Sequence, residues 1–163
     1  MSFKRIFSFV LLISMLSSFV FVFCSCEKAQ SADLLMNEFC RTYGISATVY
    51  TPSAKEGETG YVTENFFFAL YGEGMERVAD FAIIITSDLD TVFECGVFRS
   101  YTDYDAVLVT EMLNRRLDLM RSVSASSGIR MPEAPFVLRK SKYVVMAALP
   151  DAKRAADIWK RIL

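Results

Sequence analysis

The chain carries ADFAIIIT at residues 79–86 and TVFECGVFR at residues 91–99, and these two segments decide its fold. A nearly continuous apolar run with three consecutive isoleucines is typical of a strand at the buried centre of a sheet. Only the turn-forming residues 87–90 separate the two segments, so the strands are expected to pair antiparallel. The sequence therefore predicts a central β-hairpin.

A long amphipathic helix follows this hairpin. Thr102 and Asp105 have the spacing of a capping box, in which a hydroxyl caps the helix and a carboxylate reaches back. Segment 124–128 ends the helix. Apolar residues recur every three or four positions along it and form one stripe: Ala106, Val109, Leu113, Leu117, Met120 and Val123.

A second hairpin and a last helix complete the chain. Residues 136–149 predict two strands joined by a basic tip over residues 139–142. Pro150 and Asp151 suit the start of a helix that runs to Leu163. Its apolar side comprises Ala155, Ile158, Trp159 and Ile162.

The segment before the central hairpin is less regular. Residues 33–43 predict a short helix closed by Gly44, and the alternation over residues 45–50 predicts a half-buried strand. Residues 52–60 are the most loop-like part of the chain. Residues 64–70 fit either a buried strand or a short helix. Their three consecutive phenylalanines are expected in the core, with an exposed partner-binding patch as the alternative.

Together these elements predict an α+β fold. From residue 79 onward the order is ββαββα, preceded by an N-terminal helix and strand. Two antiparallel hairpins separated by an amphipathic helix favour a single antiparallel sheet with the helices packed on one face. We expect residues 33–163 to form this one domain.

The first 25 residues have the three parts of a signal peptide. Lys4 and Arg5 give a positive start, residues 6–23 form an apolar run broken only by serines, and small residues precede a cysteine. This run of 18 residues is also at the lower limit for a membrane-spanning helix, so an uncleaved anchor is the alternative. In both cases the domain lies on the outer face of the membrane, because the basic N-terminal residues stay on the cytoplasmic side.

The leader ends in two cysteines, and FCSC at residues 23–26 resembles a bacterial lipobox. Cys26 follows a small serine and fits the position that is cut and acylated, whereas Cys24 follows a bulky phenylalanine and fits poorly. Residues 26–32 are polar in character, as expected of a short tether. The resemblance implies a signal peptide over residues 1–25 and a lipid on Cys26 that anchors the chain to the cell membrane, at its extracytoplasmic face.

The composition argues against several classes of function. Cleavage removes two of the 18 basic residues and none of the 19 acidic ones, so the mature chain is acidic. That balance argues against nucleic-acid binding and against electrostatic adhesion to anionic lipid, so the acyl chains must do the anchoring. The chain has no histidine, which removes Ser-His and Cys-His nucleophiles and histidine metal sites. We therefore expect a non-enzymatic protein with no catalytic, cofactor-binding or metal-binding residues.

The charged clusters are expected to have structural roles. Two carboxylate pairs at i, i+2 supply too few ligands for calcium, which needs about six to eight oxygens, so they are expected as turn and first-turn helix residues. Two basic clusters are expected to be solvated, with a phosphate or anionic-lipid contact as the alternative. The pairs are Asp88 with Asp90 and Asp103 with Asp105, and the clusters are Arg115 with Arg116 and the tip over residues 139–142.

Cys40 and Cys95 are the two cysteines of the domain. Outside the membrane they could form a disulfide between the first helix and the second strand of the hairpin. The alternative is a pair of buried, unreactive thiols. Cys95 alternates with Phe93 and Val97 and is therefore expected to face inward, but its spacing from Cys40 does not decide between the alternatives.

From residue 80 onward the chain resembles a group of small Gram-positive bacterial lipoproteins, domain-of-unknown-function family number four-three-five-eight. The strand pair 81–85 and 93–98, the helix with Arg115-Arg116-Leu117 and the late hairpin with Lys142-Tyr143-Val144 carry the resemblance. It implies an anchored envelope protein and transfers no catalytic residue.

These observations predict a membrane-anchored lipoprotein whose domain binds another envelope component, expected to be a protein. A small-ligand-binding lipoprotein, such as the receptor component of a transporter, is the alternative, although such receptors usually close two lobes around a ligand. A large polar pocket would favour the receptor, and an apolar exposed groove would favour the interaction module. An enzyme that uses lysine or carboxylates ranks third.

Overall fold

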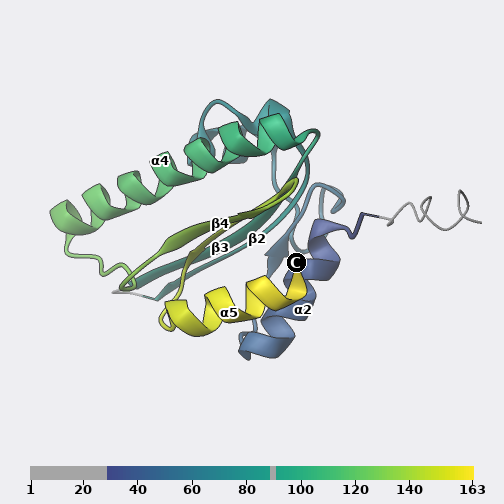
Figure 1. The fold of residues 1–163 in the computed structure, drawn as a ribbon. Helices are drawn as coiled ribbons and strands as arrows, with labels where there is room; N and C mark the ends of the chain where they lie inside the picture. The colour runs from purple at the N-terminus through teal and green to yellow at the C-terminus, as the bar shows by residue number, and fades with distance from the viewer. Residues whose placement is uncertain (1–28, 89–90) are drawn as a thin grey trace, which may run out of the picture.

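A single five-stranded antiparallel sheet forms the middle layer of the computed structural model, which describes residues 29–88 and 91–163 (Figure 1). The predicted signal peptide and Cys26 lie outside the described residues. The strand order is β1-β2-β3-β5-β4. The strands are β1 (Val49–Tyr50), β2 (Val78–Asp88), β3 (Thr91–Ser100), β4 (Phe136–Lys140) and β5 (Tyr143–Ala148).

Both predicted hairpins are confirmed, and with them the α+β class with one antiparallel sheet. In the first hairpin Ile83 pairs with Gly96 and Ile84 with Cys95. In the second, Leu138 pairs with Val145. β3 and β5 pair antiparallel in the middle of the sheet and so join the two hairpins into one sheet.

Helices cover both faces of this sheet, so the expectation that they pack on one face is wrong (Figure 1). α2 (Ala32–Tyr43) and α5 (Ala152–Ile162) cover one face, while α3 (Glu64–Tyr71) and α4 (Asp103–Ser127) cover the other. A short 3-10 helix, η1 (Met75–Arg77), precedes β2 on the α4 side.

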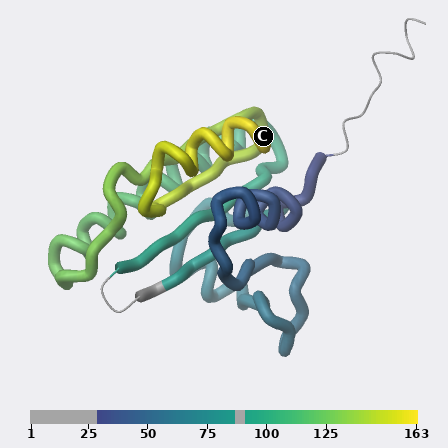
Figure 2. The backbone as a smooth tube through the Cα atoms, turned by 90° about the horizontal axis from the view of Figure 1, so that it is seen from below, coloured from purple at the N-terminus to yellow at the C-terminus, as the bar shows by residue number. Residues whose placement is uncertain are grey.

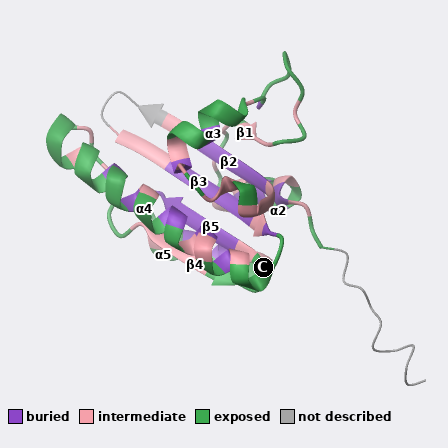
Figure 3. Ribbon diagram, turned by 90° about the horizontal axis from the view of Figure 1, so that it is seen from above, coloured by how far each residue is buried: buried purple, intermediate pink, exposed green. Residues whose placement is uncertain are grey.

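The strand sequences explain the two-sided cover. Successive strand residues point to opposite faces. In β2, Ala82 and Ile84 lie in the cluster under α2 and α5, whereas Phe81 and Ile83 lie in the cluster under α3 and α4. Because the apolar run continues through both sets of positions, each face exposes side chains that a helix must bury. Figure 3 shows the resulting burial along the central strands.

α4 begins as predicted, because the Thr102 hydroxyl oxygen accepts from the backbone N–H of Asp105 at 3.0 Å. Most of the predicted apolar stripe is buried, from Ala106 to Met120. Val123 is the exception, because the last turns of this 25-residue helix are largely exposed and its side chain lies 47% exposed.

The N-terminal part departs from prediction in three places. Only Val49 and Tyr50 of the predicted strand 45–50 pair with β2. Segment 64–71 is a helix, and of its three phenylalanines only Phe67 is buried, because one face of a single exposed helix meets the core. Ala32, expected in the tether, is the fully buried first residue of α2.

The domain has two distinct ends along α4, which is about 37 Å long. The first described residues leave the domain at the end where α4 begins, and the last turns of α4 lie at the opposite end (Figures 1 and 2). Over residues 29–88 and 91–163, no helix combines the length and the apolar character that a membrane crossing requires.

Candidate functional site

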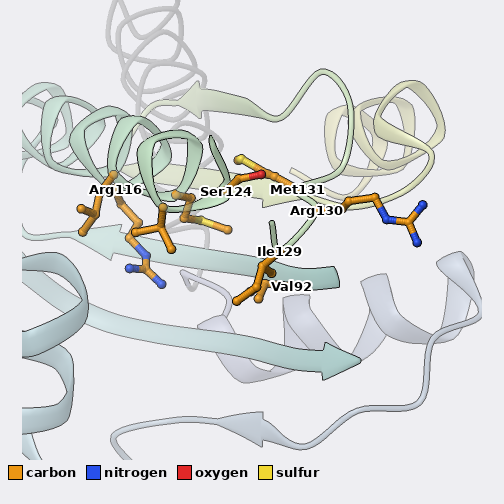
Figure 4. Close-up of a pocket in the computed structure, with 9 residues that line it drawn as sticks. Val92, Arg116, Ser124, Ile129, Arg130 and Met131 are labelled. Carbon is orange, nitrogen blue, oxygen red and sulfur yellow. The ribbon is translucent and has the colours of Figure 1, made fainter. Parts of the chain in front are cut away.

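A small apolar pocket lies beneath the C-terminal turns of α4 (Figure 4). Its volume is about 160 Å³. Most of its lining is aliphatic or thioether surface. The lining residues are Val92, Arg116, Leu119, Met120, Val123, Ser124, Ile129, Arg130 and Met131.

The chain builds this pocket by turning back under its own helix. Gly128 adopts a left-handed conformation, with φ of 75°, and ends α4. The backbone N–H of Val92 then donates to the carbonyl of Arg130 at 3.2 Å, which ties the returning segment to the start of β3. Ile129 and Met131 are thereby held opposite α4, while Arg130 points away from the other lining residues (Figure 4).

The rim of the pocket is exposed and apolar. Leu119 and Val123 lie one turn apart on α4, with exposed fractions of 50% and 47%. Both also line the pocket, so a partner that covers the rim can place a side chain into the hollow. Exposed apolar side chains grouped beside an apolar cavity are one mark of a protein contact surface.

Arg116, which lines the pocket, also belongs to a buried polar network. Its Nη2 donates to Oε2 of Glu94 at 2.7 Å, and its Nε lies 3.2 Å from both oxygens of the same carboxylate. The Tyr71 hydroxyl donates to Oε1 of Glu94 at 3.0 Å. The network therefore joins α3, β3 and α4 at one carboxylate.

The protonation states in this network follow from burial and charge. Burial, together with the Glu94 carboxylate, raises the pKa of Tyr71 well above its usual value of 10.0. Burial alone would lower the pKa of Arg116, but the hydrogen bonds and charge of Glu94 outweigh it and raise that pKa. Tyr71 therefore stays neutral and Arg116 charged. With its oxygens engaged by both donors, Glu94 serves as a structural acceptor.

The expectation that Arg116 lies on a solvated surface is wrong. The sequence patterns also gave no role to Glu94. Only Arg115 of that pair is exposed. Two signals could have found the network. Glu94 interrupts the apolar run from Val92 to Phe98, and Arg116 lies four residues from both Met112 and Met120 on the buried side of the helix.

Cys40 and Cys95 are both free thiols in the structure, so the disulfide alternative is not formed there. Cys95 is fully buried, as predicted, and burial raises its pKa far above the usual 9.0. Cys40 lies partly buried against the same core cluster, and burial raises its pKa as well. Both shifts oppose thiolate formation, so neither side chain is activated as a nucleophile.

Of the two predicted carboxylate pairs, the structure describes the side chains of Asp103 and Asp105. The Asp105 carboxylate accepts from the hydroxyl of the capping residue Thr102 at 2.6 Å and pairs with Arg77 at 3.1 Å, and Asp103 accepts from the Ser141 hydroxyl at 3.0 Å. Asp90 lies outside the described residues. Within the described part of the chain, no group of three or more cysteines or carboxylates is placed to hold a metal ion.

Comparison with known proteins finds no relative of this chain. No family model, no curated protein and no solved structure matches the chain. The resemblance to lipoprotein family four-three-five-eight therefore stays a prediction, and the function rests on the geometry of the domain.

Proposed function

We propose that this chain is an extracytoplasmic lipoprotein, anchored by acyl chains on Cys26, whose domain is a non-enzymatic module for binding another envelope protein. The observation that carries the binding role is the α4 pocket, which is small, apolar and bordered by the half-exposed Leu119 and Val123. Its occupant in this proposal is a single apolar side chain of the partner, of leucine or phenylalanine size.

The volume of the α4 pocket supports the protein-binding module over the small-ligand receptor. Small-ligand sites usually have about 300–1,000 Å³, whereas this pocket has about 160 Å³. A cavity of roughly 150 Å³ accommodates one benzene ring. The α4 pocket therefore fits an anchoring side chain better than a metabolite.

Two larger hollows beside α2 and α5 are less suited to hold a ligand. They have volumes of about 500 and 620 Å³. Their walls include exposed or charged side chains such as Leu34, Glu38 and Arg161, so a ligand there would keep much of its surface in water. A receptor normally buries most of its ligand.

Residue chemistry supports a non-enzymatic role. Glu94, the buried carboxylate next to the pocket, is engaged by Arg116 and Tyr71. The chain has no histidine to act as a base. Ser124 lines the pocket. Among the described residues, its hydroxyl has no hydrogen bond to a base that would activate it as a nucleophile.

Photocrosslinking in living cells tests the binding role. A photoreactive amino acid replaces Val123, or, as the matched control, Val107, which is exposed on the same helix at its other end. We expect the Val123 position to crosslink to one envelope protein and the Val107 position not to do so. We expect Leu119→Asp to abolish the crosslink, because a carboxylate at the rim disfavours an apolar contact.

Equal crosslinking at both positions, or a crosslink that survives Leu119→Asp, would contradict this role. Thermal stabilisation of the purified protein by a small metabolite would instead favour the receptor.

Radiolabelled palmitate tests the anchor separately. We expect the label on the wild-type chain and on Cys24→Ser, and its loss in Cys26→Ser. Label that vanishes in Cys24→Ser and persists in Cys26→Ser would assign the acylation to the other cysteine.

A further inference from the structure

The first described residues are fixed on the edge of the domain by two hydrogen bonds. The Tyr143 hydroxyl donates to the carbonyl of Gln30 at 2.7 Å, and the backbone N–H of Ala32 donates to Oδ2 of Asp80 at 2.8 Å. Cys26 precedes Gln30 by four residues, a chain length that spans at most about 14 Å when fully extended. An acylated Cys26 would therefore hold this end of the domain against the membrane surface.

The basic tip of the second hairpin lies at this same end. The backbone N–H of Ser100 donates to the carbonyl of Lys142 at 2.8 Å, and the Ser141 hydroxyl donates to Asp103 at the start of α4. Tyr143, which holds Gln30, directly follows the tip. The tip carries Arg139, Lys140 and Lys142, all exposed and without an ion pair among the described residues.

Exposed aromatic and aliphatic side chains accompany the tip. Tyr101 and Tyr104, at the start of α4, have exposed fractions of 60% and 70%, and Leu34 on the first turns of α2 has 62%. Tyrosine, with an apolar ring and a polar hydroxyl, and lysine, with an apolar stem and a charged head, both favour the membrane–water interface.

Two of the carboxylates at this end, Asp105 and Asp80, lie beside arginines. Asp105 pairs with Arg77, Asp80 accepts from Ala32 and lies 3.9 Å from Arg99, and Asp103 accepts from Ser141. The tip therefore gathers three unpaired positive charges within four residues, while Asp33 and Asp103 are carboxylates near residue 30 without a cation partner among the described residues. The chain as a whole is acidic.

We infer that this end of the domain docks onto anionic phospholipid headgroups of the membrane that holds Cys26. The inference rests on the proposed acyl anchor. The anchor supplies a high effective concentration of lipid, so contacts too weak to bind an untethered acidic protein suffice to orient it. Each lysine or arginine near an anionic surface favours docking by about fivefold.

Docking in this orientation determines where the α4 pocket lies relative to the membrane. Leu119 to Ser124 lie 16 to 21 residues beyond Asp103 along α4, which is roughly 24–32 Å. The last turns of α4 lie at the opposite end of the domain from the first described residues (Figures 1 and 2). The pocket beneath these turns is then away from the membrane and accessible to a partner protein.

Quenching by brominated phospholipid tests this orientation. The acylated product that begins at Cys26 is extracted from membranes and reconstituted into vesicles of brominated phosphatidylcholine with phosphatidylglycerol. Tyr104→Trp reports on the docked end and Leu119→Trp on the far end of the same helix, with the buried Trp159 as a common background. We expect strong quenching of the added tryptophan in Tyr104→Trp and little in Leu119→Trp.

Charge variants in the Tyr104→Trp background test the lipid chemistry. The double variant Lys140→Glu and Lys142→Glu should lower the docking equilibrium by more than about 25-fold, at two charges of about fivefold each. Arg115→Glu, an exposed reversal on the middle of α4, should leave quenching unchanged. Vesicles of brominated phosphatidylcholine alone should give the weak quenching of the double variant.

Equal quenching at positions 104 and 119, or quenching indifferent to phosphatidylglycerol, would overturn the docking inference while the acyl anchor stands. Mass spectrometry of the same preparation distinguishes this outcome from failure of the anchor. A product without acyl chains would overturn both.

Discussion

Arg116 of α4 and Glu94 of β3 form an ion pair, 2.7 Å between Nη2 and Oε2, inside the interface between helix and sheet. The Glu94 side chain is fully buried and that of Arg116 is 14% exposed. Such a pair fixes the position of α4 over β3, because any other position leaves a buried charge without a partner.

Removing one member of this pair should destabilise the domain strongly. We expect Arg116→Met to lower the free energy of unfolding by about 3–5 kcal/mol, since Glu94 then stays buried without its cation. The double variant Glu94→Leu and Arg116→Met should lower the free energy of unfolding by less than Arg116→Met alone does. Urea denaturation of the three proteins measures this, and additive losses from the two substitutions would contradict it.

The fold could be predicted from sequence where a local pattern has one interpretation. The hairpin at residues 79–99 and the Thr102 cap of α4 are such cases. The two-sided helix cover was missed, although the unbroken run through Ala82, Ile83 and Ile84 contains the information. A strand that is apolar at every position needs cover on both faces, whereas an alternating one needs it on a single face.

Gly96 is required by close packing at the centre of the sheet. A Cβ at this position would lie 2.6 Å from Cε2 of Phe98 and 2.8 Å from Cγ2 of Ile83. We expect Gly96→Ala to lower the free energy of unfolding by about 1–3 kcal/mol. Adding Phe98→Leu, which removes the ring atoms, should recover part of this loss, and a cost independent of Phe98 would contradict the packing explanation.

The stability of the domain should fall in alkaline solution. Burial raises the pKa of Cys95 above its usual 9.0 and that of Tyr71 above 10.0, so the folded chain holds protons that the unfolded chain releases. The contribution of each group is complete below its unfolded pKa and is lost as pH rises toward the folded one. We expect a slope of up to about 1.4 kcal/mol per pH unit for each group, first from Cys95 and then from Tyr71.

Urea denaturation at successive pH values from neutral to alkaline measures this slope. The double variant Cys95→Ala and Tyr71→Phe should show a clearly flatter dependence over the same range. An unchanged slope would mean that other groups cause the alkaline loss.

The candidate site was less accessible to sequence reasoning than the fold. The α4 pocket depends on Val92 and Met131 lying together, 39 positions apart in the chain, and no local spacing encodes that contact. Likewise, helical spacing could place Arg116 beside the buried stripe, but no local pattern pairs it with Glu94, 22 positions earlier in the chain.

The two thiols should differ in reactivity. In the folded protein we expect iodoacetamide to modify Cys40 slowly and Cys95 not at all, because Cys95 is fully buried and its pKa is far above the usual value. In urea both should react without added reductant. If either required a reductant before it could be alkylated, the two would be joined in the disulfide that the structure lacks.

Intact-mass spectrometry of the protein extracted from native membranes tests the central claim, that the domain is held to the membrane by lipid on Cys26. We predict one product that begins at Cys26 and carries acyl chains on that residue. A product that retains Met1 and has no acyl modification would contradict the anchor and the membrane-docked orientation built on it.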